Sequence, residues 1–218
     1  TCIGGNGTEI GRAIRVDSGG NSYVTGNTTS TNFPVAASLQ IAFGGNQNGG
    51  PNGDAFALKL NSSGTNLLYS TYLGGSRDDV GQSVFVNSLG EAFYAGITRS
   101  LNFPSTGPLI VPTDRAVYLL RLSSNGLTLQ GSWFADGVND GDRFTVVMDS
   151  KSNVFLTGGA SSGIRLPVAA APPIFPFKSP QDSLILKLSN SRLQVFQDTF
   201  SPSFLNTQDF DLIQRVVN

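Results

Sequence analysis

The chain has 218 residues and a formal net charge of −1, and only 13% of its residues are charged. This balance offers no basic surface for the phosphate backbone of a nucleic acid. The sequence contains no histidine, which excludes Ser-His-Asp and Cys-His nucleophile systems and zinc sites that need imidazole. No apolar run is long enough to span a membrane. The single cysteine, Cys2, cannot form an internal disulfide, and we expect it to be a small buried residue.

The first part of the chain predicts four β-strands joined by turns and by one long connection. Short apolar runs alternate with Gly, Asn, Ser and Thr, a pattern typical of strands and turns. The predicted strands are Arg12–Asp17, Ser22–Gly26, Ala55–Leu60 and Leu67–Leu73. The connection over residues 27–53 is long for a compact fold, and loops of that length often carry function.

The same four-strand unit recurs twice further along the chain. Three landmarks repeat: a glycine that closes the second strand, an apolar residue followed by proline, and a basic residue followed by leucine. They are Gly26, Gly96 and Gly158; Phe33-Pro34, Phe103-Pro104 and Leu166-Pro167; and Lys59-Leu60, Arg121-Leu122 and Lys187-Leu188. The period is roughly 65 residues. We therefore expect units at approximately 6–75, 76–137 and 138–204, with a partial fourth unit at 205–218.

One aromatic position is shared by the three units. Tyr23, Phe93 and Phe155 each stand beside small residues in the predicted second strand. A large ring at that place suits packing between two sheets. The sequence therefore predicts an all-β chain of three four-stranded antiparallel sheets packed face to face, with these rings in equivalent buried places.

The repeated unit resembles the bacterial β-propeller repeat family SBBP. The resemblance is carried by Tyr69 to Gly75, Val16 to Asn21, Tyr23 to Gly26, Phe33-Pro34 and Asp54 to Leu60. It is close in the first two units and decays in the third. The family implies four-stranded blades around a central axis, usually on secreted or surface-exposed bacterial proteins. It implies no common activity, so function has to be argued from sites.

Residues 1–218 are thus predicted to form a single β-propeller domain that is partial or open. About three full blades with partial terminal ones are too few to close a ring, because propellers typically carry at least four. Either residues outside this chain complete the ring, or the unit is an open arc packed on a partner. The resemblance places the protein in the extracellular space, at the cell surface or in the periplasm.

An acidic loop before the third unit is a candidate calcium site. Asp136, Asn139, Asp140 and Asp142 offer four oxygen-bearing side chains, which Ca²⁺ prefers. The loop lacks EF-hand spacing. The alternative is that Asp and Asn simply form the turn by bonding their own backbone. Calcium is the single cofactor that the sequence brings into consideration.

Two other polar sets have a functional and a structural interpretation. Asp78 and Asp79 are paired carboxylates of the kind that act on sugars, but neighbours on a strand point to opposite faces. Lys59, Arg121 and Lys187 recur at one position. They are either a basic ring for an anionic ligand or a solvated or salt-bridged strand edge, and we expect the edge.

An apolar loop in the third unit is a candidate partner contact. Ile174, Phe175 and Phe177 lie in its Ala/Pro-rich segment, and exposed apolar loops mark protein contacts. The alternative is that the loop folds back over its own blade.

The sequence favours a non-catalytic function. We expect an interaction or structural module, a subunit or fragment of a larger assembly that binds a protein partner or itself. The alternatives are a glycan-binding module and a carbohydrate-active or calcium-dependent enzyme domain. The lack of histidine and the presence of only two Glu residues, Glu9 and Glu91, argue against catalysis.

Overall fold

The computed structural model describes residues 1–47, 50–107, 114–138, 141–160, 182–189 and 192–196. These residues form twelve strands and no helix, which confirms the predicted all-β class. The strands are β1 (Glu9–Val16), β2 (Ser22–Thr28), β3 (Asp54–Leu60), β4 (Leu67–Leu73), β5 (Asp79–Val86), β6 (Ala92–Thr98), β7 (Ala116–Leu122), β8 (Leu129–Asp136), β9 (Phe144–Met148), β10 (Val154–Ala160), β11 (Asp182–Ser189) and β12 (Arg192–Phe196).

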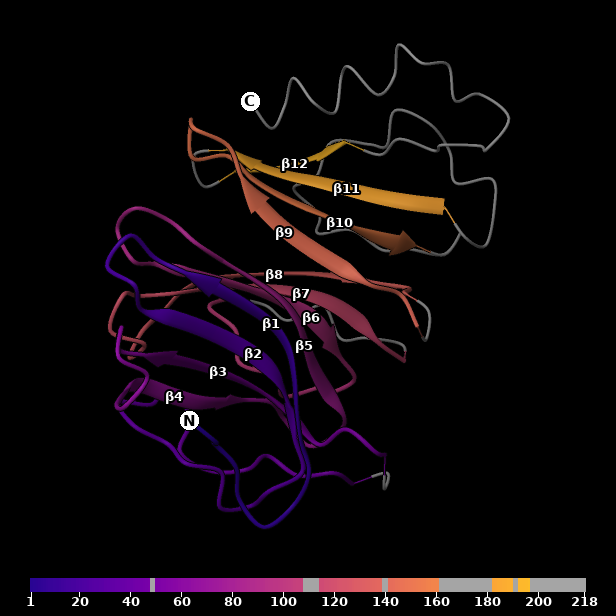
Figure 1. The fold of residues 1–218 in the computed structure, drawn as a ribbon. Coiled ribbons are helices and arrows are strands. Elements are labelled where there is room, and N and C mark those ends of the chain that lie inside the picture. The colour runs from indigo at the N-terminus through magenta and orange to yellow at the C-terminus, as the bar shows by residue number, and fades with distance from the viewer. Residues whose placement is uncertain (48–49, 108–113, 139–140, 161–181, 190–191, 197–218) are drawn as a thin grey trace.

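The strands form three four-stranded antiparallel sheets. In each sheet the strands neighbour one another in chain order: β1 to β4, β5 to β8 and β9 to β12. Figure 1 shows the three sheets stacked face to face, the first in indigo and purple and the third in orange. Strands β1 and β2 pack against β5, and β5 in turn packs against β9. This arrangement is consistent with a β-propeller-like repeat fold in which the first strand of each sheet lies innermost.

Each sheet has two faces of different character. We call the face that carries Tyr23, Phe93 or Phe155 the ring face, and the opposite one the aliphatic face. On β3, Ala55 and Ala57 belong to the ring face, where they pack with Tyr23 and Tyr69. Large apolar residues of the same strand occupy the aliphatic face, because side chains alternate along a strand. Both faces are apolar, so a sheet can be covered on both sides.

The ring face of one sheet packs on the aliphatic face of the next. The core between the first and second sheets joins ring-face residues such as Tyr69 and Leu73 to Val84, Tyr94 and Leu120. The core between the second and third sheets repeats the pattern. It consists of Phe93, Ala95, Val117, Leu119, Ala135, Val138, Phe144, Val146, Val154, Leu156 and Leu186. At both interfaces, therefore, the ring face belongs to the earlier sheet and the aliphatic face to the later one.

In the first two sheets, the recurring glycine is explained by a β-bulge. The register of β1 with β2 shifts between Gly11 and Ala13, and that of β5 with β6 shifts at the equivalent place. A Cβ added to Gly26 would lie 1.8 Å from the backbone oxygen of Ile10, and one added to Gly96 would lie 1.9 Å from that of Val80. Only glycine permits this approach. The bulges leave one extra residue on each inner strand.

Some expectations need correction at the level of single residues. Tyr23 and Phe93 are buried as predicted, whereas Phe155 is half-buried. Cys2 is exposed, so the expectation of a buried residue is wrong. The fourth strand of the second unit begins at Leu129, after a turn closed by the N–H of Gly126 on the carbonyl of Ser123. Among the described residues, no helix has the length and apolar character needed to cross a bilayer.

Candidate interaction surface

The aliphatic face of the first sheet is open where the same face of the other two sheets is covered. Ile14, Val84 and Val146 occupy equivalent places, each paired with the middle of the second strand of its sheet. Ile14 is 56% exposed, whereas Val84 and Val146 are 0% exposed. Val16, at the end of β1, is 58% exposed. Isoleucine and valine at this exposure form an uncovered apolar strip along the inner strand.

The outer part of this face is covered by the chain itself. Phe33, from the long connection after β2, packs on Phe56 with ring centroids 4.9 Å apart. Phe43, from the same connection, packs edge-on against Tyr72 at 6.0 Å. The hydroxyl of Tyr72 donates to the carbonyl of Ser30 and accepts from the N–H of Phe33, both at 2.8 Å. The long connection thus covers β3 and β4 but leaves β1 open.

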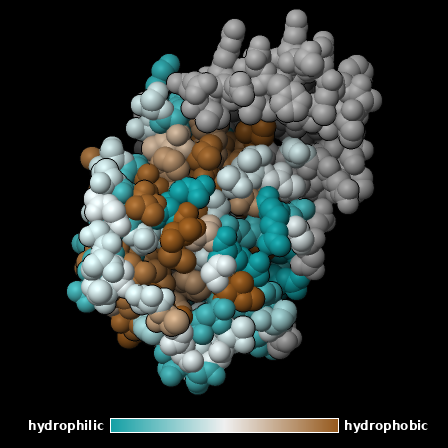
Figure 2. Space-filling model, in the orientation of Figure 1, coloured by the Kyte–Doolittle hydropathy of each residue, from teal (hydrophilic) through white to brown (hydrophobic). Residues whose placement is uncertain are grey.

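Figure 2 shows hydrophobic side chains in several places on the side where the first sheet faces the viewer in Figure 1. The partly buried members on this face include Val24, Leu60 and Leu67. We call Ile14, Val16 and these three residues the open face. An apolar strip next to a covered core is what a sheet presents when it lacks its neighbour.

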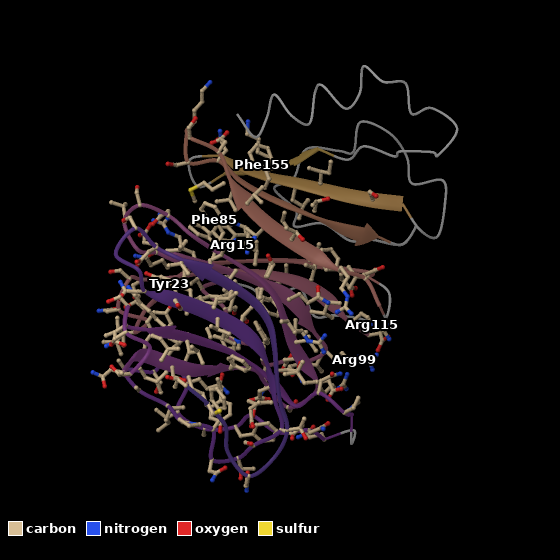
Figure 3. The ribbon with its side chains drawn as sticks, viewed as in Figure 1. Arg15, Tyr23, Phe85, Arg99, Arg115 and Phe155 are labelled. Atoms are coloured by element: carbon tan, nitrogen blue, oxygen red, sulfur yellow. The ribbon has the colours of Figure 1, made fainter. Side chains whose placement is uncertain are left out.

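The recurring basic residues lie opposite the recurring rings. Lys59 pairs across the strands with Tyr23, and its ammonium lies 4.7 Å from the ring centroid. Arg121 lies 5.8 Å from the ring centroid of Phe93, and Lys187 lies 5.6 Å from that of Phe155. Figure 3 labels Tyr23 and Phe155 on the first and third sheets. Each sheet therefore carries a cation over an aromatic face.

A carboxylate accompanies each of these cations. Asp17 lies 3.8 Å from Lys59, and Glu91 accepts from Arg121 at 2.7 Å. In the third sheet, burial tends to raise the pKa of Asp149. Hydrogen bonds from Asn153, and then the charge of Lys187, outweigh this effect and hold the pKa below its usual range. The expectation of a strand edge is wrong, because these cations sit on the interior strands β3, β7 and β11. The expected salt bridges are present for Lys59 and Arg121. Together with the cation–ring contacts, they stabilise the ring face.

A second repeated cluster ties the start of the inner strand to the end of the second strand. Oε1 of Glu9 accepts from the hydroxyls of Thr28 and Ser30. In the second unit, Oδ2 of Asp79 accepts from the hydroxyl of Ser100 and from the N–H of Gly75, both at 2.8 Å. Through these hydrogen bonds, the two carboxylates hold the loops together at one end of the sheets.

Asp54 is a third carboxylate at this end, and it is the least well paired. Its Oδ2 accepts from the N–H of Gly44 at 2.7 Å, but its Oδ1 is buried without a hydrogen-bond partner. Burial raises the pKa of Asp54 to about 8, and the charges of Asp79 and Asp78 add to this rise against the Gly44 hydrogen bond. Burial likewise raises the pKa of Asp79 to about 7. Ionising Asp54 and Asp79 in the folded protein therefore costs free energy, and this cost depends on pH.

The paired carboxylates do not converge on a common point. Asp78 accepts from the amide of Asn52 at 3.1 Å and from the N–H of Gly53, whereas Asp79 faces the Ser100 loop. In the described part of the chain, no three His, Cys, Asp or Glu side chains come together in a way that would hold a metal ion. Asp78 and Asp79 therefore do not form the pair of facing carboxylates, one acid and one base, that sugar hydrolysis uses.

The predicted calcium site falls only partly within the described residues. Asp136 ends β8 and is buried, and Asp142 precedes β9 and is half-buried. Asn139 and Asp140 lie outside the described residues, so calcium binding there stays a prediction. The predicted partner contact at Ile174, Phe175 and Phe177 also lies outside them.

Comparison with known sequences identifies one repeat. The family model SBBP, described as a beta-propeller repeat, matches residues 2–34. The match confirms the resemblance over β1, β2 and the Phe33-Pro34 that follows them. A repeat of this family suggests a non-enzymatic repeat module. Among curated proteins, none matches the chain.

Proposed function

We propose that this chain is a non-catalytic interaction and structural module whose open face binds another four-stranded sheet. The observation that carries the proposal is the 56% exposure of Ile14 against the 0% exposure of Val84 and Val146 at the equivalent places. In both other sheets the equivalent residue is covered by a neighbouring sheet. A four-stranded sheet is therefore the kind of element that covers this position.

The molecule itself indicates the chemistry of the occupant. Twice along the chain, an aliphatic face receives a ring face that carries a large ring beside alanines. The open face presents the same kind of residues in the same register as Val84 and Val86. We therefore propose that it binds the ring face of a further sheet, and that a second copy of the chain can supply that sheet.

The energetics favour such an association. Burying apolar surface stabilises by about 25 cal/mol per Å². Covering a strip of several apolar side chains is therefore worth several kcal/mol, before the cost of association. As part of this proposal, the module acts outside the cytoplasm, at the cell surface or in the periplasm, because that is where the SBBP resemblance places such repeats.

The proposal is tested by sedimentation of the full chain across the micromolar range. We expect the chain to self-associate, and we expect Ile14→Asp combined with Val16→Asp to shift it to a monomer. Leu89→Asp is the matched control, because Leu89 is 73% exposed on the turn between β5 and β6, away from the open face. It should leave the association unchanged.

Two results would contradict the proposal. One is a monodisperse, cooperatively unfolding monomer at every concentration. The other is an association that persists in the Ile14 and Val16 double variant while Leu89→Asp abolishes it. Circular dichroism of each variant separates a lost contact from a lost fold, because the double substitution lies on an exposed strand face.

A further inference from the structure

Residues 1–3 lie on the aliphatic face of the first sheet in the way that the end of β4 lies on the same face of the second. The side chain that makes the contact is Ile3 in one case and Leu73 in the other. Ile3 packs against the cluster of Phe33, Phe56, Leu58 and Tyr72. Leu73 belongs to the cluster that contains their counterparts in the second sheet, Phe103, Tyr118, Leu120 and Phe134. Ile3 and Leu73 therefore occupy equivalent places.

The hydrogen bonds that follow these residues are also repeated. The N–H of Asn6 donates to Oδ1 of Asn32 at 2.7 Å, and the N–H of Ser76 donates to Oδ1 of Asn102 at 2.9 Å. The next residue of each segment donates its N–H to a serine hydroxyl, from Gly7 to Ser30 and from Arg77 to Ser100. The same contacts thus fix both segments at the same place on their sheets.

The two segments differ in the pairing of their backbone. The end of β4 pairs with β3, whereas residues 1–3 form no backbone–backbone hydrogen bond with another described residue. The hydroxyl of Thr1 donates to the carbonyl of Gly64, in the turn between β3 and β4, and holds the segment at that end. Cys2 is exposed, although its counterpart Tyr72 is buried. Residues 1–3 thus have the position of a strand end and offer their backbone groups to an incoming strand.

The third sheet is open at the matching place. Ile185 of β11 is the counterpart of Ala57 of β3, since each pairs with a threonine at the same position of the second strand. The pairing of β3 with β4 continues for two positions beyond Ala57, whereas that of β11 with β12 ends at Ile185 and Phe196. Within the described residues, Ser183 and Leu184 therefore pair with β10 alone.

The ring face of the third sheet is the one that no other described sheet covers. The ring faces of the first and second sheets are buried in the two cores between sheets. A second copy that packs as the sheets do within one chain therefore brings its third sheet to the open face. That sheet is open at the two positions that correspond to Cys2 and Ile3.

We propose that residues 1–3 add to the third sheet of a second copy, with Cys2 opposite Leu184 and Ile3 opposite Ser183. The inference rests on the proposed function, because the ring face of that sheet has to dock on the open face. It goes further, since it names the sheet, the strand and the register. Main-chain hydrogen bonds stabilise such strand addition. Ile3 already packs where Leu73 packs in the first interface, so the contact continues an interface that the chain contains.

The register can be tested with Cys2, the single cysteine of the chain. Leu184→Cys places a thiol opposite Cys2 of the neighbouring copy, at a spacing that antiparallel pairs share with disulfides. Under mild oxidation at micromolar concentration, this variant should form an intermolecular disulfide roughly tenfold faster than Ile185→Cys, because pairing raises the effective concentration of the two thiols. Ile185→Cys is the matched control, since neighbouring residues of a strand point to opposite faces. Non-reducing electrophoresis measures both rates.

Two further measurements separate the possible outcomes. Adding Cys2→Ser to Leu184→Cys should abolish the fast cross-link. Sedimentation of the same proteins under reducing conditions reports whether the copies associate through the open face. If they do, and Leu184→Cys cross-links no faster than Ile185→Cys, the pairing of residues 1–3 with β11 is overturned while the proposed function stands. A chain that stays monomeric at every concentration would overturn both.

Discussion

The two interfaces between sheets have the same topology but different chemistry. Between the first and second sheets, the hydroxyls of Tyr69 and Tyr94 form a buried hydrogen bond of 2.7 Å. The hydroxyl of Tyr23 crosses the same interface to the carbonyl of Gly90 at 3.3 Å. Between the second and third sheets, Phe93, Phe144 and their neighbours form an apolar cluster. A small apolar cavity, lined in part by Trp133, lies in that second interface.

The comparison shows that one stacking geometry tolerates two ways of filling the gap. Hydrogen bonds between buried hydroxyls need correct partners at fixed distances, so they specify how the first two sheets align. In the second interface, aliphatic and phenyl groups fill the space between the sheets, and the hydrogen bonds from Gln82 and Ser83 join only the inner strands. The two interfaces should therefore respond differently to the same kinds of substitution.

The largest effect should come from removing volume in the second interface. Phe144 is 2% exposed, and Phe144→Ala should lower the free energy of unfolding by about 3–5 kcal/mol. Trp133, the single tryptophan, packs against this cluster, so its fluorescence in urea reports the loss. Leu127→Ala, on an exposed turn, is the control and should change stability by less than about 0.5 kcal/mol. If both variants lost a similar amount of unfolding free energy, the volume of Phe144 in the second interface would have no special role in stability.

The second effect is a pH dependence that belongs to the end of the first interface. The pKa values of Asp54 and Asp79 lie at about 8 and about 7 in the folded protein, against 3.8 for an ordinary Asp. Between about pH 4 and pH 8 the folded state holds more protons than the unfolded chain, so the unfolding free energy falls as pH rises. The fall should amount to several kcal/mol, since each unit of a raised pKa corresponds to about 1.4 kcal/mol.

Replacing the carboxylates separates this effect from the rest of the molecule. Asp54→Asn keeps an acceptor for the N–H of Gly44 but cannot ionise, so stability should fall less steeply with pH. Asp114→Asn, on an exposed side chain, should leave the slope unchanged. Urea unfolding at a series of pH values measures both. An Asp54→Asn slope equal to that of the unmodified chain would show that Asp54 does not titrate in this range.

A smaller effect should distinguish the hydroxyl pair. Tyr94→Phe leaves the hydroxyl of Tyr69 buried and unpaired, which costs about 1–2 kcal/mol. Tyr69→Phe should cost a similar amount, and the double variant should cost less than the sum, because no orphan hydroxyl remains. Urea unfolding of the three variants forms the cycle. Additive losses would mean that the hydrogen bond does not couple the two sheets.

The smallest effect concerns the cation over the ring. Lys59→Met keeps the aliphatic stem but removes the charge above Tyr23 and beside Asp17. The loss should be about 0.5–1 kcal/mol. Lys151→Met, at an exposed turn, should have no measurable effect. If the two variants unfold at the same urea concentration, the ring–cation contact contributes nothing.

The sequence predicted the sheets because their signals are local. Alternating apolar residues set the strands, and recurring landmarks such as Gly26 and Gly96 set the repeat. The reason for those glycines was not visible, since it depends on a backbone oxygen brought close by a bulge in the neighbouring strand. Pairing across strands was also hidden, so Lys59 was expected at an edge although it faces Tyr23 on an interior strand.

The candidate sites depend on contacts between distant segments, and the sequence predicted them less well. Nothing near Asp54 in sequence indicates that Gly44 and Asp79 surround it. A signal was present for the open face, since Ile14 and Val16 match Val84 and Val86 in the repeat. Their different exposure follows only from which sheets are stacked.

The direction of stacking has a consequence for symmetry. A ring face on an aliphatic face joins two unlike surfaces, so an assembly built this way is heterologous and cannot be a two-fold dimer of identical patches. Each added copy would occupy one open face and present another. Growth would then stop only where the rotation between successive sheets closes a ring, and would otherwise continue as a filament. The rotation between neighbouring sheets, rather than the strength of any one contact, would decide between these two forms.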